Sequence, residues 1–306
     1  NLKALKNGEE GWYGDLLVVI GYEINDVDDA NHYLAFGLTE ELNRNLPAQE
    51  YVRQVREEGG FGIIAHPDEK RDLMPEHPSY PWRAWDSEDY QGIEIWNQMS
   101  EWMEGLTHWN KIWRLVNPLK SIVAPEKETL QRWDAVSQKR PVAGIGGVDA
   151  HAHKHKILGG LFYVTIFRYK IQFKSVRTHL MVPQDFHAGL PPEKAKSYIF
   201  ESLTSCRAFI SNHINGDARG SRFYLQAKDG FRYPLGSGVP LQKGLQLKVN
   251  VPLAGEIRLI HNGRLTSEKS GRTAEFPIAQ AGVFRIEVHR KERPWIFSNH
   301  FRILSE

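Results

Sequence analysis

Short runs of apolar residues, each closed by a glycine or a polar residue, recur through the first half of the chain. Three of them span residues 16–20, 61–65 and 92–96, and a fourth begins at Pro141 and leads into a glycine pair. Runs that are apolar at nearly every position, as these are apart from Glu94, are typical of strands buried on both faces, as in a parallel sheet. Helical patterns lie between some of these runs, so we expect a parallel-rich α/β sheet or barrel.

Several stretches have apolar residues at helical spacing. Residues 48–60 have an apolar face and end on two glycines, which predicts a helix and its stop. Residues 100–116 carry a stripe of aromatic and aliphatic side chains, and we expect this stripe to face the core. Further helices are expected over residues 128–136 and 191–209.

The pattern changes near Asn212. Short segments of alternating polarity follow, over residues 223–227, 245–251, 256–261, 273–278, 283–289 and 296–303. The Asn262-Gly263 pair between two of them is typical of a two-residue hairpin turn. We therefore predict an α/β domain over residues 1–212 and a small all-β sandwich over residues 213–306.

Composition narrows the chemistry that the chain can carry. The chain has 306 residues and a net charge of +2, so no strong field favours nucleic acid or an anionic membrane. No apolar run reaches the roughly 18 residues that a membrane span needs. A single cysteine, Cys206, excludes disulfides within the chain and a cysteine-based zinc cluster. Any metal must therefore be held by His, Asp and Glu.

Polar side chains that could bind a metal stand at the ends of the expected strands. They are Glu23, His66, Asn97, and Asp149 with His151. In α/β sheets and barrels, ligand sites lie beyond the carboxyl ends of the strands. Buried carboxylates and imidazoles are costly unless they are paired or bind a metal. Each residue alone is compatible with a solvated loop, but four such positions on one edge favour a metal site.

Five short motifs occur in a specific order and spacing. They are IGYEI around Glu23, HYLAFGL around His32, IIAHP around His66, GIEIWN around Glu94 and GGVDAH around Asp149. Together they resemble the polymerase-and-histidinol-phosphatase (PHP) superfamily of metallohydrolases. The stretches FKSVRTHL, SCRAFISN, IRLIHNGR and GVFRIEV…RPWIFSNHF are similar to the branch that includes carbaryl hydrolase, in which a β-sandwich follows the catalytic domain.

The resemblance implies a distorted seven-stranded β/α barrel with two or three divalent metal ions at the carboxyl ends of its strands. Glu23 would bridge two of the ions, and His32 and His66 would complete the ligands of one. Asp149 would bind the ion that Glu23 shares, and His151 would bind a possible third ion. Oxygen and nitrogen ligands of this kind suit manganese, zinc or iron.

One departure from the family concerns the start of the chain. The family opens with a His-x-His motif on its first strand, and no such motif precedes Glu23 here. We expect this motif, and the N-terminal strand that carries it, in a stretch upstream of Asn1. The alternative is a degenerate member that lacks part of its site. A signal peptide could also lie upstream, so the sequence leaves the compartment open, whether cytoplasmic or extracytoplasmic.

The resulting hypothesis is a metal-dependent hydrolase that acts on a small anionic or ester substrate. Two ions bridged by one carboxylate share a hydroxide, which can attack a phosphoester or a carboxyl ester, carbamate or amide. Asn97 and Glu94 are candidates for orienting a ligating histidine. Arg177 is a candidate for binding the substrate's negative charge, with a surface salt bridge as its alternative role.

Two other functions are compatible with parts of the sequence. The barrel could be inactive, with a sandwich that binds a carbohydrate or a protein partner; Trp82, Trp85 and Trp295 would suit sugar stacking, although Trp295 is expected to pack inside the sandwich. A nucleic-acid-processing phosphatase or nuclease is the third hypothesis. The near-neutral charge and the lack of a basic stripe disfavour it, so we expect no nucleic-acid partner.

Overall fold

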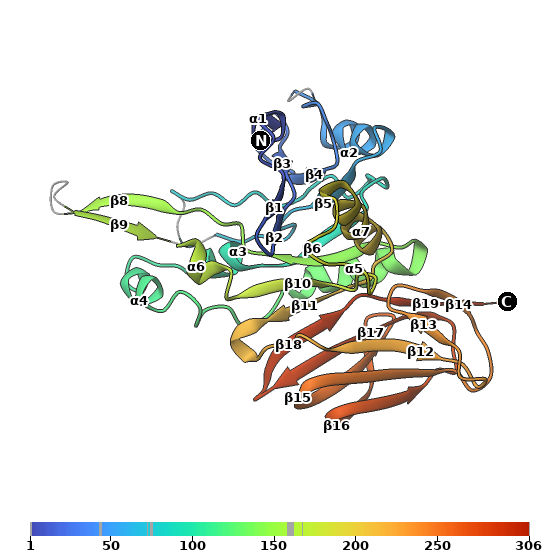
Figure 1. The fold of residues 1–306 in the computed structure, drawn as a ribbon. Helices are drawn as coiled ribbons and strands as arrows, with labels where there is room; N and C mark the ends of the chain where they lie inside the picture. The colour runs from blue at the N-terminus through green and yellow to red at the C-terminus, as the bar shows by residue number, and fades with distance from the viewer. Residues whose placement is uncertain are drawn as a thin grey trace.

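The computed structural model describes residues 2–42, 45–71, 73, 76–157, 162–166 and 168–305. An α/β region formed by the first part of the chain lies against a β-rich region formed by the last part (Figure 1). The fold is therefore mixed α/β, followed by an all-β portion, as the hydrophobic pattern predicts.

A five-stranded sheet forms the centre of the α/β region. In spatial order its strands are β3 (Gly21–Ile24), β4 (Tyr33–Phe36), β5 (Phe61–Ile64), β6 (Gly92–Asn97) and β7 (Ala143–Gly147). Strands β3, β4 and β5 pair antiparallel, whereas β5, β6 and β7 pair parallel. Every residue of β5 and β6 is buried, which explains why these runs are apolar almost throughout. The closed seven-stranded barrel is not confirmed.

The first apolar run does not form a buried parallel strand, so that prediction is wrong. Within residues 16–20, β2 (Leu16–Val18) pairs antiparallel with β1 (Gly11–Tyr13) in a separate hairpin. Leu16 is 64% exposed. A turn at Gly14, with a φ of 64°, brings the two short strands together. As a consequence Glu23 lies inside the following strand, β3, and not beyond the end of a strand.

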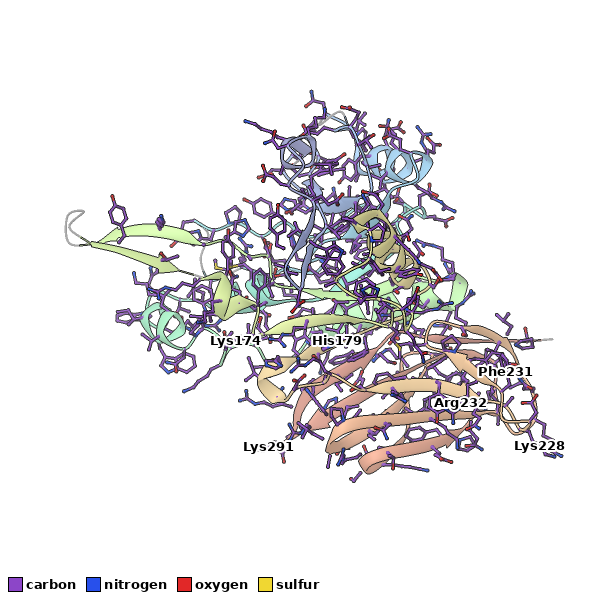
Figure 2. The ribbon with its side chains drawn as sticks, in the orientation of Figure 1. Lys174, His179, Lys228, Phe231, Arg232 and Lys291 are labelled. Carbon is purple, nitrogen blue, oxygen red and sulfur yellow. The ribbon has the colours of Figure 1, made fainter. Side chains whose placement is uncertain are left out.

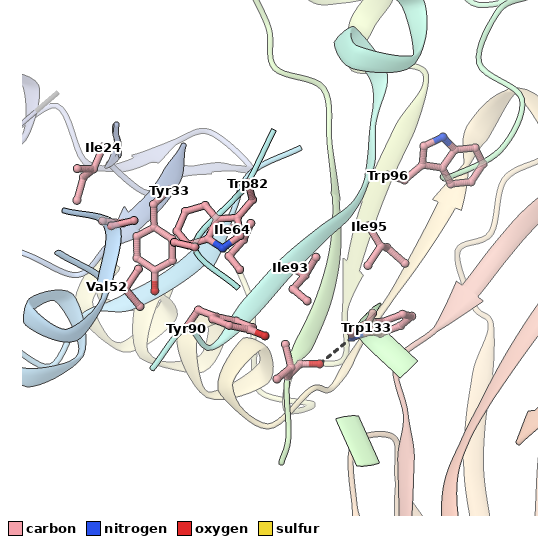
Figure 3. Packing of buried hydrophobic residues seen from close by; sticks show 14 of the residues in the cluster. Ile24, Tyr33, Val52, Ile64, Trp82, Tyr90, Ile93, Ile95, Trp96 and Trp133 are labelled. Atoms are coloured by element: carbon pink, nitrogen blue, oxygen red, sulfur yellow. Dashed lines mark hydrogen bonds between the residues drawn. The ribbon is translucent and has the colours of Figure 1, made fainter. Parts of the chain in front are cut away.

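Seven α-helices flank the strands in the described residues. They are α1 (Leu2–Lys6), α2 (Ala48–Glu57), α3 (Gln98–Met103), α4 (Lys111–Val116), α5 (Lys127–Lys139), α6 (Tyr169–Gln172) and α7 (Pro192–Thr204). The predicted helix over residues 48–60 is confirmed, and Val52 of α2 packs into the main core with Tyr33, Ile64 and Trp82 (Figure 3). Trp133 of α5 belongs to the same core, and its Nε1 donates to the backbone carbonyl of Val142 at 2.9 Å.

The stretch over residues 100–116 is two short helices, α3 and α4, and not one continuous helix. The chain breaks at Gly105, whose φ of 65° no helix can continue. Trp102 of α3 is buried, but α4 has no buried residue, and Trp109 beside it is 96% exposed. The expectation that the whole aromatic stripe faces the core is therefore wrong.

One ten-stranded sheet, mostly antiparallel, contains the C-terminal strands. They are β12 (Arg222–Gln226), β13 (Arg232–Pro234), β14 (Gly238–Pro240), β15 (Gln246–His261), β16 (Arg264–Pro277), β17 (Gly282–Arg290), β18 (Arg293–Ser298) and β19 (Phe301–Leu304). The long strand β15 pairs with β12 along its first part and with β17 along its second. The predicted turn at Asn262-Gly263 is confirmed, because both residues have positive φ and join β15 directly to β16.

Two strands from before residue 213 belong to this same sheet. They are β10 (Val176–Leu180) and β11 (Ala208–Asn212), and β11 pairs with β18. Strand β10 also lies beside β7, where the Thr178 hydroxyl donates to the Gly146 carbonyl at 2.7 Å and accepts from the Gly146 N–H at 2.8 Å. His179 of β10 therefore lies between the two regions (Figure 2). The domain division at residues 212 and 213 stays a prediction.

The tryptophans considered for sugar stacking are largely withdrawn from solvent. Trp82 is 3% exposed and Trp295 is fully buried, as expected for Trp295. Trp85 is partly buried, and the Arg132 guanidinium lies 4.5 Å from the centre of its ring. These side chains do not form an exposed aromatic platform for a carbohydrate.

The remaining strands, β8 (His153–Ile157) and β9 (Phe162–Ile166), form an antiparallel hairpin that extends away from the body of the molecule (Figure 1). Among the described residues, no helix has the length and apolar character that crossing a membrane requires.

Candidate metal site

Three side chains meet at one end of the five-stranded sheet. Glu23, His32 and His66 each offer a ligand atom, and these atoms all lie within 4.8 Å of one another. The Glu23 Oε1 atom is 2.5 Å from Nδ1 of His32 and 3.6 Å from Nε2 of His66. Because β3, β4 and β5 are neighbours in the sheet, Glu23 and His32 come together with His66, which lies more than thirty residues further along the chain.

The loop before β4 is tied down by its own polar side chains, which fixes the position of His32. The Asp26 carboxylate accepts from the Ala30 N–H at 2.9 Å and from the Asn31 side chain at 2.6 Å. The Asn31 carbonyl oxygen of the side chain accepts in turn from the backbone N–H of Arg83 at 2.6 Å. Such local bonds favour a turn over a strand or helix, so His32 stands at a defined bend.

His66 and Asp149 occupy equivalent places at the carboxyl ends of two parallel strands. Each lies two residues beyond its strand, β5 or β7, and each has a positive φ, of 27° for His66 and 47° for Asp149. This conformation is uncommon for residues with a β-carbon and costs about 1–3 kcal/mol. It turns both side chains out of the strand direction at the edge of the sheet where α/β proteins bind ligands.

Glu94 holds the backbone of His66 in place. Its Oε2 atom accepts from the His66 N–H and from the Asn97 side chain, both at 2.9 Å. Asn97 also caps α3, since its Oδ1 accepts from the Ser100 N–H. A β-carbon on Gly147 would lie 2.1 Å from Glu94 Oε1, which explains the second glycine of the pair before Asp149. Burial raises the pKa of Glu94 to about 7.

The electrostatics of the group favour a bound positive charge. Burial alone would raise the pKa of Glu23, but the adjacent imidazoles of His32 and His66 lower it well below its usual range. Burial would lower the pKa of His66, yet Glu23 and the other neighbouring carboxylates raise it to about 9. The pKa of Asp149 is raised by burial. Carboxylates thus surround the buried imidazole, and a cation among them would relieve their repulsion.

The donor set fits a divalent metal ion. One carboxylate and two imidazoles are oxygen and nitrogen ligands of the kind that zinc, manganese and iron take. Two further ring nitrogens, Nε2 of His32 and Nδ1 of His66, are buried with no hydrogen-bond partner in the described part of the chain. They lie 3.9 Å from Asp29 and Glu69 respectively. Ligating histidines commonly turn their second nitrogen towards such a carboxylate.

Asp149 and His151 line the same cavity but lie outside the three-residue group. The cavity measures about 740 Å³, and Glu23, His32 and His66 line it as well. The His151 Nδ1 atom is 3.1 Å from a carboxylate oxygen of Asp149, and the His151 side chain is half exposed. All five expected metal ligands therefore meet at one cavity, and three of them form the compact group.

Neither of the two expected catalytic residues lines this cavity. Asn97 is buried behind His66 and reaches it only through Glu94. Arg177 is not among the residues that line the cavity. Its Nε donates to the Phe173 carbonyl at 3.0 Å, and its Nη1 lies 3.2 Å from Nδ1 of His213. Among the described residues, Arg177 has no carboxylate partner, so it does not form the alternative salt bridge either.

Comparisons with solved structures find two likenesses that can be described. No family model matches the chain, and no curated protein matches it. It is similar to the crystal structure of a two-domain protein from Bacteroides vulgatus that contains a predicted PHP-like metal-dependent phosphoesterase. The identity is 13%, the TM-score is 0.39, and the match covers 97% of this chain and 77% of that one. The resemblance to the branch that includes carbaryl hydrolase stays a prediction.

A second solved structure, that of CHIR-AB1, matches a smaller part of the chain. The match covers 28% of this chain and 97% of that one, at 21% identity and a TM-score of 0.22. Both likenesses are remote, and the interpretation of the site rests on its own geometry.

Sequence reasoning missed a buried carboxylate beside the site. Glu69 accepts from the Arg71 guanidinium, from the Tyr80 N–H at 3.0 Å and from the Ser100 hydroxyl at 2.8 Å. The Tyr80 ring stacks on His32 with 4.9 Å between ring centres. The only signal in the sequence is that Glu69 follows His66 by three residues. This spacing alone does not reveal that the carboxylate turns back towards the imidazole.

Proposed function

We propose that the chain is a metal-dependent hydrolase of small phosphoesters or carboxyl-type esters, carbamates or amides. The observation that carries the proposal is the Glu23–His32–His66 group at the edge of a cavity. These three residues would hold one divalent ion: manganese, zinc or iron. Asp149, on the same cavity, is the proposed ligand of the ion that Glu23 shares, and His151 would bind a third ion.

Divalent ions at this place would lower the pKa of water towards neutrality and stabilise negative charge on a phosphoryl or carbonyl oxygen. In the hydrolysis, the oxygen of water forms a bond to phosphorus or to the acyl carbon, and the bond to the leaving atom breaks. The leaving oxygen or nitrogen takes up a proton, and the products are an acid and an alcohol or amine.

The remaining residues of the site would keep the ligands in place. Glu94 holds the backbone of His66, and Asn97 holds Glu94, so we propose Asn97 as a positioning residue. Glu69 faces the second ring nitrogen of His66 and would fix the orientation of that ring. Strands β10 and β11, beside β7, would extend the sheet towards the seven-stranded barrel that the sequence resemblance implies.

Metal content tests the proposal directly. The full chain is produced in medium that contains manganese and zinc, and its metal is measured by elemental analysis. We expect at least about one ion per chain, and loss of this ion in Glu23→Ala and His66→Ala. His108→Ala is the matched control, because His108 is 67% exposed and lies away from the three-residue group. A purified chain without metal, or variants that retain it fully, would refute the proposal.

A further inference from the structure

The cavity at the candidate metal site has two chemically different sides. The ionisable side chains described above form one of them. The other is an apolar wall formed by side chains of α3, α4 and the turn between them: Met99, Trp102, Met103, Leu106 and Leu115. Water cannot form hydrogen bonds with these side chains. An apolar group placed against the wall would be removed from solvent, which favours its binding.

The part of the apolar wall on α3 and the turn after it is built into the core and does not depend on a ligand to form, whereas Leu115 of α4 is 38% exposed. Met99, Trp102 and Leu106 are 4–6% exposed, and Met103 packs against the main core. Reciprocal hydrogen bonds link α3 to α4, since the Trp102 indole donates to the Arg114 carbonyl at 3.3 Å and Arg114 donates back to the carbonyl of Trp102. The wall is therefore pre-organised, which reduces the entropic cost of binding a ligand against it.

Helix α4 presents one face to the cavity and another to solvent. Lys111 and Leu115, four residues apart, lie on one face of the helix and both line the cavity. Val116, the next residue, does not line it and is 74% exposed. A substitution of Val116 can therefore serve as the control for the same substitution of Leu115.

We infer that the substrate carries a bulky apolar group, aromatic or branched aliphatic, next to the ester or amide that reacts. This inference rests on the proposed function, because the reacting group is taken to lie at the metal ligands. A hydroxyl group placed against this wall, as in a sugar phosphate or a nucleotide, would find no hydrogen-bond partner among the five apolar side chains. An aromatic group would instead bury its surface against side chains that already exclude water.

Binding of non-hydrolysable ligands to the full, metal-supplemented chain tests the inference without relying on turnover. Calorimetry compares benzylphosphonate with methylphosphonate and phenylacetate with acetate, so that the two pairs represent phosphoester and carboxyl-type substrates. We expect the aromatic member of at least one pair to bind about tenfold or more tightly than its small counterpart. Leu115→Ser should weaken binding of that aromatic ligand about threefold or more, and the matched Val116→Ser should leave it unchanged.

The outcomes distinguish the inference from the proposed function. If neither aromatic ligand binds more tightly than its small counterpart, or if Leu115→Ser and Val116→Ser have equal effects, the inference is wrong, even where the metal content is as proposed. If the aromatic preference and its dependence on Leu115 appear in a chain that holds no metal, the apolar wall is supported and the proposed function fails. Leu115→Met, which preserves apolar bulk, should retain the preference in either case.

Discussion

Two clusters of carboxylates and imidazoles occupy different parts of the molecule. In the first, Asp134 of α5 accepts from Arg285 at 2.7 and 2.9 Å and from Nε2 of His300 at 2.7 Å. The side chains of all three are at most 5% exposed. In the second, the partners of the Glu23 carboxylate in the described part of the chain are the imidazoles of His32 and His66, and its side chain is 40% exposed at a cavity.

The difference between the clusters lies in where the positive charge comes from. Arg285 carries a permanent charge and joins the C-terminal sheet to α5, so the Asp134 cluster is complete within the chain. An imidazole is neutral unless it binds a proton, and the nitrogen that binds a proton can bind a metal ion instead. The same residue types thus serve an internal junction in one place and a candidate ligand site in the other.

The largest effect that we expect is a loss of unfolding free energy when the Asp134 cluster is broken. Asp134→Ala leaves the Arg285 charge buried, with Glu287 as its one remaining carboxylate partner among the described residues, and should lower the free energy of unfolding by about 3–5 kcal/mol. Denaturant unfolding measures this change. Asp217→Ala is the control, because its ion pair with Arg219 is exposed and should contribute less than about 1 kcal/mol. Equal losses in the two variants would show that the junction contributes no more than a surface pair.

A smaller effect tests whether the candidate metal site depends on its supporting residues. Gly147→Ala would place a β-carbon 2.1 Å from Glu94 Oε1 and should displace the carboxylate that holds His66. We expect a loss of up to about 3 kcal/mol in unfolding free energy and at least about tenfold weaker metal binding. In Gly238→Ala, the nearest atom to the new β-carbon would be 3.9 Å away, so neither quantity should change. If Gly147→Ala binds metal as tightly as the native chain, Glu94 does not support the metal site.

The pH dependence of stability tests whether Asp134 is stabilised as a carboxylate by Arg285 and His300. Burial alone would raise the pKa of Asp134, but His300 and Arg285 lower it from 3.8 to about 2. A lowered carboxyl pKa stabilises the fold above the unfolded value and loses this contribution as pH falls from about 3.8 to about 2. The contribution amounts to about 2 kcal/mol. Unfolding of the native chain and of Asp134→Asn, compared across this range, should show the extra acid sensitivity only in the native chain.

Those parts of the fold that depend on local pattern could be predicted from the sequence. The helix α2 and the buried strands β5 and β6 follow their apolar spacing, and the Asn262-Gly263 turn follows from the positive φ that it needs. Residues 16–20 and 100–116 were not predicted correctly. An apolar run of five residues does not reveal its pairing partner, and the helical stripe continues past Gly105 although the helix does not.

The candidate site could be predicted where a residue follows a parallel strand, as His66 and Asp149 do. Arg177 was expected at the site but does not line the cavity, because its side chain on β10 contacts Phe173 and His213. The contributions of Glu69 and of the apolar wall could not be predicted from the sequence either. They depend on how α3, α4 and the segment after β5 pack in three dimensions, and no spacing along the chain encodes that packing.

The central claim is that Glu23, His32 and His66 bind a metal ion, whereas the Asp134 cluster is structural. Calorimetric titration of the metal-free full chain with Mn²⁺ or Zn²⁺ tests it most directly, with Glu23→Gln and Asp134→Asn measured beside the native chain. We predict that Glu23→Gln weakens binding about a hundredfold or more, and that Asp134→Asn loses stability but keeps its affinity. Equal affinity of Glu23→Gln and the native chain would contradict the claim.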